Sequence, residues 1–587
     1  MKTQYRALAY LIMGSVVFSL AFGVAWNYLH SVEGKQSYLK QYYAPAVMIA
    51  QGKGFVNPDL AQAPAINEFI RMQTDSLDPS QIPDELHLLP LSQYQLLHRH
   101  SMYVMGWTWW FFGLHWDSIY YLQALLFALS TVALLALFSQ FLPGWMSFLF
   151  TLFMIWSPLQ LYAIADFRDY SKAPFLLGTL ALMAFLLVRE RKFSVALSVA
   201  VLVGIILGVG MGFRQDLLIC IPLYVAQLLL FYPAAIRQSW KIRVLLIVVL
   251  VSAWGLCAAP LFSTMKNGTS SYHFIVQGMA SNFNRDLQLG GAAYQLLDEY
   301  SDERAHTMIS AYAHHGMEMP QGPAYWTNAY DRAGAAFAMD VYMLMPADEF
   351  IRGLAATNDL LNRAPFVLER NSGPVFVQGP LIDRLLQWRW GWLGWIYNRG
   401  LYIGVLAFLM LAYINVRWAF AALFTTLYLC AYQQFQFNVR HYFFLEWIPW
   451  LCLVLVIYFS FRGVLLWIKV KRKTVTEAEG EHLFSSVRLR CIKTSLATVF
   501  VLAVFMLVWV LTTLIQNINV GTHLQRYAQA KRSVLQGKVT AINNVPVIEV
   551  LDFLNPDTVT EYEKNIRVQT GMLVAELRTE AYPYTVE

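Results

Sequence analysis

The sequence contains few charged residues and few cysteines, and both shortages restrict what the protein can be. Only 14% of its 587 residues are charged, whereas 57% are hydrophobic. A soluble protein could not bury that much apolar surface, so the composition excludes an ordinary soluble enzyme. The cysteines all lie in or beside apolar runs, which excludes a disulfide framework or a zinc-ligand spacing. They are Cys220, Cys257, Cys430, Cys452 and Cys491.

Signatures of nucleotide and nucleic-acid chemistry are also missing. The only short glycine motif of this kind, Gly52–Phe55, is far too weak to serve as a phosphate-binding loop. The net charge of +6 is mild, and the basic residues gather in short segments between apolar runs. We therefore expect no nucleic-acid partner. No nucleophile–base pair typical of a hydrolase stands out either.

Long apolar runs dominate instead, and they predict an all-α polytopic membrane protein with about eleven transmembrane helices. One crossing needs about 20 apolar residues. The first run, Ala7–Trp26, follows two basic residues and lacks a small-residue cleavage site, so we interpret it as a retained span. The predicted spans are 7–28, 118–141, 144–164, 173–189, 194–213, 217–234, 243–263, 398–416, 418–434, 442–467 and 491–515.

Lysine and arginine predict the orientation of these spans. With a cytoplasmic N-terminus, basic residues concentrate in the inner segments, for example 189–192, 237–243 and 462–493. This is the bias expected of cytoplasmic loops. The C-terminus would then be extracytoplasmic.

This topology predicts two domains. Residues 1–515 form a transmembrane module whose two large loops, 31–116 and 264–395, lie on the outer face. Residues 516–587 form a small extracytoplasmic α+β domain, in which Val547–Leu551 has the pattern of a strand. The first loop ends with WTWWFFGLHW, whose tryptophans suit the level of the lipid headgroups.

One stretch, ADFRDYSKAP, places four ionisable residues between two apolar runs. Each would cost roughly 2.5–3.5 kcal/mol at the centre of a membrane helix, so they must lie at an interface or in a polar cavity. In a helix, Asp166 and Asp169 share one face and Arg168 and Lys172 share another. Such a cluster could hold an anionic group against a carboxylate. The alternative is a solvated loop whose charges anchor the helix ends.

Further charged residues recur where predicted spans meet the outer face. They are Arg99 in the first loop, Arg214 and Asp216 between two spans, and Arg440 and His441 before a late span. The phosphate of a lipid carrier would lie at this depth, and arginine suits it because it stays charged and binds with two parallel hydrogen bonds. The alternative for the arginines is snorkelling to the headgroups.

Short motifs follow one another in a particular order along the chain. The first outer loop opens with YYAPAVMIAQGKGF and ends with HRHSMYVMGWTWWFFG, and acidic residues follow in the next loop. A glycine-rich span ends in GVGMGFR, and RHY precedes a late span. In this layout the chain resembles the GT-C superfamily of polytopic glycosyltransferases, which take sugars from polyprenyl-phosphate carriers. The resemblance covers roughly the first 260 residues and the region 398–467.

The resemblance implies an inverting transfer of a sugar from polyprenyl phosphate to a hydroxyl of a glycan or lipid acceptor. The reaction would take place on the extracytoplasmic face of a bacterial inner membrane, among membrane lipids. In one place the chain departs from the family, whose catalytic aspartate usually lies just before the first-loop tyrosine, where 37–40 reads SYLK. The base is then Asp169 or Asp166, or else Glu33, or the chain is not an active transferase. Of the first two, Asp169 is favoured, because Arg168 and Lys172 flank it and would hold it ionised at neutral pH.

The resemblance also implies which residues would bind the phosphate of the donor. These candidates are Arg99, Arg168, Lys172, Arg214, Asp216, Arg440 and His441. Part of the family uses a divalent metal, so such an ion is a possible cofactor, without assigned ligands here.

Two other functions remain open. A lipid-linked glycan transporter or assembly protein would share the basic edge but need no base. An O-antigen-type polymerase or ligase uses outer-loop arginines without an essential acid. Replacing each acid in turn separates these functions, because only the transferase should depend sharply on one of them.

Overall fold

The computed structural model describes 2–32, 40–233, 239–290, 300–317, 319, 322–365, 367, 380–471, 477–529, 536–542 and 545–551. Helices dominate these residues, and the predicted all-α, multi-pass membrane fold is confirmed at that level. Seven described helical segments are long and apolar enough to cross a membrane. They are built on α1 (Lys2–Ser31), α6 (Ser118–Phe138), α9 (Phe167–Tyr170) with α10 (Ala173–Val188), α11 (Phe193–Met211), α13 (Ser239–Met265), α23 (Val439–Tyr442) with α24 (Trp447–Lys471), and α25 (Glu477–Gln529).

Two further pairs of helices are bent, and if each pair counts as one broken span, the described residues contain nine candidate spans. The helices α7 (Gly144–Ile155) and α8 (Pro158–Ile164) meet at 58°. Pro158 has no N–H to continue the ladder of α7, and Ser157 caps α8 by accepting a hydrogen bond from the backbone N–H of Gln160. The other pair, α20 (Pro380–Ile396) and α21 (Gly400–Ile414), meets at 83°.

Two predicted spans, 217–234 and 418–434, correspond to shorter helices. These are α12 (Cys220–Phe231), which follows the 3-10 helix η3 (Gln215–Ile219), and α22 (Val416–Tyr432). The number of eleven therefore stays a prediction, although an apolar helix occupies each of these two stretches.

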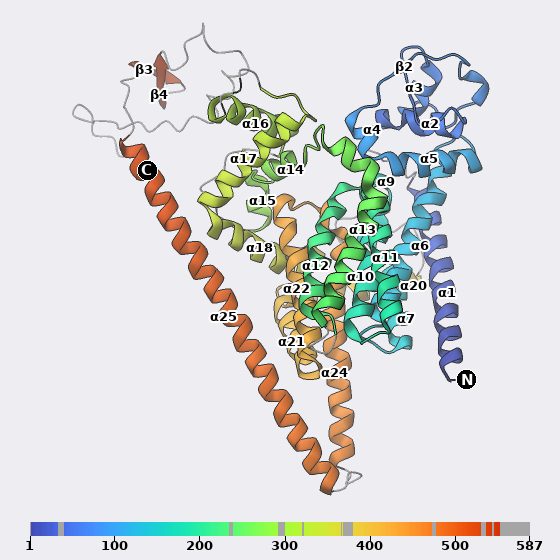
Figure 1. The fold of residues 1–587 in the computed structure, drawn as a ribbon, viewed down its shortest axis with the longest axis vertical. Coiled ribbons are helices and arrows are strands. Elements are labelled where there is room, and N and C mark those ends of the chain that lie inside the picture. Colours follow the sequence, from blue (N-terminus) through green and yellow to red (C-terminus); the bar gives the residue numbers. More distant parts are fainter. Residues whose placement is uncertain are drawn as a thin grey trace.

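The two large loops lie at the same end of the helix bundle (Figure 1). The exposed aromatic side chains of α5 (Arg99–Phe112) include Trp107 and Trp110, which fits the predicted headgroup level. The first loop consists of η1 (Lys40–Tyr43), α2 (Ala44–Ala50), β1 (Asn57–Pro58), α3 (Pro64–Ile70), η2 (Pro79–Gln81), β2 (Leu88–Leu89), α4 (Gln93–Leu97) and α5 (Arg99–Phe112), with β1 antiparallel to β2. The second contains α14 (Ser271–Gln277), α15 (Ser281–Asp286), α16 (Asp302–Gly316), α17 (Asn328–Leu344) and α18 (Pro346–Leu361). Helix α20, which the predicted loop 264–395 includes, is instead half of the bent apolar pair α20–α21.

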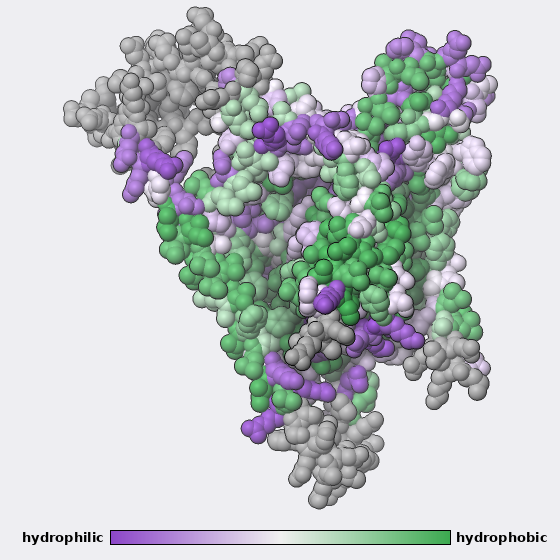
Figure 2. All heavy atoms as spheres, viewed as in Figure 1, coloured by the Kyte–Doolittle hydropathy of each residue, from purple (hydrophilic) through white to green (hydrophobic). Residues whose placement is uncertain are grey.

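The visible surface shows a broad apolar band over the helices, with polar residues concentrated toward both ends (Figure 2). This is the distribution expected of a protein that faces lipid around its middle. The second loop does not stay wholly above this band, because α18 packs against α22 and α20 reaches the broken span α7–α8.

The C-terminal part begins inside a helix. Helix α25 is continuous from Glu477 to Gln529 and therefore runs without a break through the predicted domain boundary at 515/516. After it, β3 (Gln536–Ile542) and β4 (Val545–Leu551) pair antiparallel, and the predicted strand Val547–Leu551 lies within β4. Residues 552–587 lie outside the described part of the chain.

Helices α11 and α13 approach each other closely because α11 presents glycines to its neighbour. A Cβ atom added to Gly204 would lie 2.4 Å from the carbonyl oxygen of Leu250, and one added to Gly208 would lie 2.5 Å from the Cβ of Cys257. Small residues that let two backbones approach are a common basis of helix packing in membranes.

We expect Gly204→Ala to lower the stability of the protein by about 1–3 kcal/mol, because the new methyl group overlaps backbone atoms that cannot move aside cheaply. Thermal unfolding of the purified protein in detergent measures the effect. Gly255→Ala in α13 is the matched control, because its Cβ would meet nothing within 4 Å. An unchanged midpoint for Gly204→Ala would contradict the close contact.

Candidate functional site

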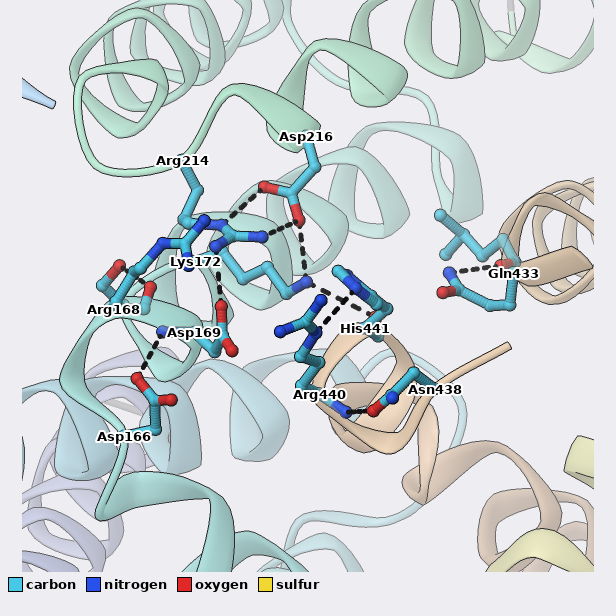
Figure 3. A network of polar contacts seen from close by, with 12 residues as sticks. Asp166, Arg168, Asp169, Lys172, Arg214, Asp216, Gln433, Asn438, Arg440 and His441 are labelled. Carbon is cyan, nitrogen blue, oxygen red and sulfur yellow. Dashed lines mark hydrogen bonds and ion pairs between the residues drawn. The ribbon is translucent and has the colours of Figure 1, made fainter. Parts of the chain in front are cut away.

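The candidate site lies where the ends of several candidate membrane helices meet (Figure 3). The stretch between α8 and α10 folds into the one-turn helix α9, which starts where the Asp166 carboxylate accepts a hydrogen bond from the backbone N–H of Asp169 at 3.2 Å. Lys172 follows this turn at the start of α10, and residues far apart in the sequence join it, namely Arg214 and Asp216 after α11, and Arg440 and His441 in α23. The structure therefore brings most of the predicted site residues together.

Four of these residues form a connected ion-pair network. The Arg214 Nη1 donates to Asp169 Oδ1 at 2.6 Å, and its Nε donates to Asp216 Oδ1 at 3.3 Å. The Lys172 Nζ donates to Asp216 Oδ2 at 2.8 Å. Both cations are deeply buried, and the two carboxylates offset the free-energy cost of burying their charges.

The segment around α23 lies on the other side of the network. The Arg440 Nε donates to His441 Nε2 at 3.1 Å, so that nitrogen acts as an acceptor and the imidazole is neutral. A second guanidinium nitrogen of Arg440 donates to the hydroxyl of Tyr300 in the second outer loop. The Lys172 ammonium lies 5.1 Å from the centre of the Phe444 ring.

Arg168 differs from the other cations. Its guanidinium carbon lies 5.7 Å from the centre of the Tyr94 ring, and its Nε is buried without a hydrogen-bond partner. Among the described residues, no carboxylate lies within ion-pair distance of Arg168 or Arg440. These two guanidinium groups are therefore the ones available to an incoming anion.

The cluster as a whole carries a surplus of positive charge. With His441 neutral, four cations face three carboxylates, which leaves a net charge of about +1. A buried surplus of this kind favours binding of an anion. The cations are Arg168, Lys172, Arg214 and Arg440, and the carboxylates are Asp166, Asp169 and Asp216.

The two acids of α9 have different environments. Asp166 is partly exposed, and burial together with the neighbouring Asp169 carboxylate raises the pKa of Asp166 to about 6. Asp169 is only 3% exposed; one of its carboxylate oxygens is engaged by Arg214, and the other is buried without a partner. Asp166 therefore has the accessibility and the proton affinity of a general base near neutral pH.

Two of the predicted site residues are not part of this network. Arg99 places its guanidinium carbon 5.7 Å from the centre of the Phe55 ring within the first outer loop. Glu33 lies outside the described residues. Its predicted role as an alternative base therefore stays a prediction.

The two histidines that flank Arg99 are hydrogen-bonded to backbone carbonyls. His98 Nδ1 donates to the carbonyl oxygen of Tyr94 at 3.0 Å, and His100 Nδ1 donates to that of Val209 at 2.9 Å. Burial, with a contribution from the charge of Arg168, lowers the pKa of His98 to about 3, so it is neutral. The His100 contact attaches the first loop to the end of α11, close to Arg214 in the sequence.

The acids do not form an evident metal site. In the described ranges, no group of three or more histidine, cysteine, aspartate or glutamate side chains is placed to hold an ion. Asp169 and Asp216 already have Arg214 and Lys172 as partners, which is a poor donor set for a divalent cation. We derive no step through a metal.

Sequence reasoning missed a second polar cluster, around Glu446 and Arg389. Both side chains are almost completely buried and form an ion pair between α20 and the start of α24. Arg389 lies in the tryptophan-rich stretch QWRWGW and Glu446 lies in FFLEW, so each was an isolated charge among apolar residues. That isolation was the available signal, because a charge among membrane spans needs a partner.

Comparison with known proteins does not extend this description. No protein-family model, no curated protein and no solved structure matches this chain. The geometry and charge of the site are therefore the basis for inferring its function.

Proposed function

We propose that this protein is a GT-C-like glycosyltransferase that moves a sugar from a polyprenyl-phosphate carrier to an acceptor hydroxyl on the extracytoplasmic face. The observation that carries the proposal is the combination in one site of surplus cations and a partly exposed carboxylate, Asp166, whose pKa lies near 6. The proposal includes the eleven-span topology, a cytoplasmic N-terminus and a bacterial inner membrane. The acceptor is a glycan or a lipid.

The proposed reaction is an in-line displacement at the anomeric carbon. Asp166 removes the proton of the acceptor hydroxyl, whose oxygen forms the new bond to the sugar. The bond between the sugar and the phosphate oxygen breaks, and polyprenyl phosphate leaves with the electron pair. A base with a pKa near 6 is mostly ionised at neutral pH and is still basic enough to accept the proton of the hydroxyl.

Arg168 and Arg440 neutralise the charge that grows on the departing phosphate. They suit this role because neither has a carboxylate partner within ion-pair distance in the described structure. Donors fixed before the reaction usually provide the largest part of such catalysis. Lys172, Arg214 and Asp216 have a supporting role, because their ion pairs hold Asp169 and α9 in place.

An apolar groove next to the site supports a lipid-linked donor. It has a volume of about 690 Å³ and lies between α6, α10 and α11. Its lining on α10 begins at Pro174, two residues after Lys172, and also includes Phe175, Gly178 and, after α6, Gln140. A polyprenyl chain in this groove would start beside the charged cluster, where its phosphate has to lie.

The test is transfer by the purified protein in liposomes that contain polyprenyl-phosphate sugars, with lipid analysis of cells that carry or lack the gene. We expect release of polyprenyl phosphate together with a glycosylated acceptor, and an undecorated glycan in cells without the gene. Movement of an unchanged lipid-linked glycan across the membrane, without bond cleavage, would overturn the proposal in favour of a transporter.

A further inference from the structure

The second buried cluster is a node in which one carboxylate receives hydrogen bonds from three side chains. The Ser157 hydroxyl lies 2.8 and 2.6 Å from the two oxygens of Glu446, so it can donate to either. The Gln160 amide donates to Oε2 at 3.1 Å, and the Arg389 guanidinium donates to Oε1. A carboxylate among membrane spans is tolerated when it is satisfied this completely.

The same side chains satisfy the backbone where the span α7–α8 is broken. The bend leaves carbonyl groups at the end of α7 without the partners that a continuous helix provides. Arg389 Nη1 donates to the carbonyl oxygen of Phe153 at 3.0 Å, and its guanidinium carbon lies 4.4 Å from the centre of the Phe153 ring. The node therefore joins α20 to the broken span.

Two of the segments joined at the node lead directly into the candidate site. Helix α8 begins beside Ser157 and ends just before Asp166, and its last carbonyls accept hydrogen bonds from the buried amide of Gln123. On the other side, Gln160 also donates to the carbonyl oxygen of Phe443 at 2.6 Å. Phe443 and Glu446 follow closely after the segment that carries Arg440.

We propose that Glu446, paired with Arg389, is a positioning residue that sets the relative placement of Asp166 and Arg440. It does not touch the reacting groups; it holds α8 and the segment after α23 against each other. The catalytic part of this inference rests on the proposed glycosyl transfer, whereas the structural link between the two segments does not. A displacement of about 1 Å in such a site can cost about 100-fold in rate.

The experiment uses the full-length protein in detergent and the variant Glu446→Gln, which keeps the shape but removes the charge. Hydrogen–deuterium exchange reports on the backbone, and donor kinetics report on catalysis. We expect faster exchange in both 157–166 and 439–446, a turnover number lower by about 10- to 100-fold, and a Michaelis constant for the donor within about twofold of wild type.

The double variant Glu446→Gln/Arg389→Met is the rescue. It leaves no buried charge without a partner, and removal of both members of a buried ion pair is often tolerated where removal of one is not. We expect exchange in both segments to return most of the way to the wild-type level. Asp331→Asn is the matched control. It also replaces a hydrogen-bonded carboxylate by an amide, but Asp331 accepts its hydrogen bonds from Thr269 in the second large loop and is not part of the node.

Two results would overturn the positioning role. One is unchanged exchange in either segment of Glu446→Gln. The other is a general increase in exchange across the whole protein, without rescue by the double variant, which would make the node an ordinary stabilising contact. If the wild-type protein transfers no sugar, the proposed function fails, and the exchange data still decide whether the node links the two segments.

Discussion

Asp166→Asn is expected to abolish sugar transfer, with a loss of about 10²- to 10⁴-fold in turnover, while the protein still folds and inserts. The amide keeps the size of the side chain and the oxygen that caps α9, but it cannot take a proton from the acceptor. Transfer assays on purified variants measure the loss. Wild-type turnover in this variant would remove Asp166 from the mechanism and pass the role of base to Glu33 or Asp169.

The comparison with Asp169→Asn distinguishes a base from a structural acid. Asp169 is held by Arg214 through its Oδ1, so its loss should reduce transfer by disturbing the network and should also lower the midpoint of thermal unfolding. Asp166→Asn should leave that midpoint nearly unchanged. Equal effects of both variants on turnover and stability would contradict this assignment.

The pH dependence of wild-type transfer gives an independent check. Because a base has to be ionised, kcat/KM should be constant above the pKa of Asp166, near 6, and fall as the pH drops below it. Well below that pKa the decrease should approach tenfold per pH unit.

Arg214→Lys is the second change with a large expected effect. Arg214 uses one planar guanidinium to bind two carboxylates, Asp169 through Nη1 and Asp216 through Nε and Nη2. The single ammonium of lysine cannot reproduce this fork, so one buried carboxylate loses its partner. We expect kcat/KM for the donor to fall by about 10- to 100-fold, which corresponds to the loss of one or two charged hydrogen bonds.

Two further variants complete this test. Asp216→Asn should show a milder form of the same defect, because Lys172 and Arg214 keep an acceptor at that position. Arg462→Lys, at an exposed position on α24, is the matched control and should behave as wild type. Wild-type donor kinetics in Arg214→Lys would indicate that this arginine only reaches toward the headgroups, as lysine also can.

Much of the fold could be predicted from the sequence because it depends on local features. The length and apolarity of runs such as those in α6 and α11 are sufficient to specify membrane helices. The clustering of charges around Asp166 and Arg214 also pointed to one site, because each ionisable residue among spans requires an interface or a partner. The bend at 156–157 was missed, since an apolar run looks the same whether or not its helix is straight, and α20 was assigned to the loop 264–395.

Only the tertiary structure decided which partner each charge has. The sequence placed Asp169 and Arg214 at the same membrane level, but their contact joins residues 45 positions apart and depends on how α10 packs beside α11. That contact makes Asp166, not Asp169, the acid best suited to take a proton. The tertiary structure likewise joins Glu446 to Arg389, two charges that are isolated in the sequence. The physical reason is that the cost of burying a charge is set by the nearest opposite charge in space, which local sequence does not specify.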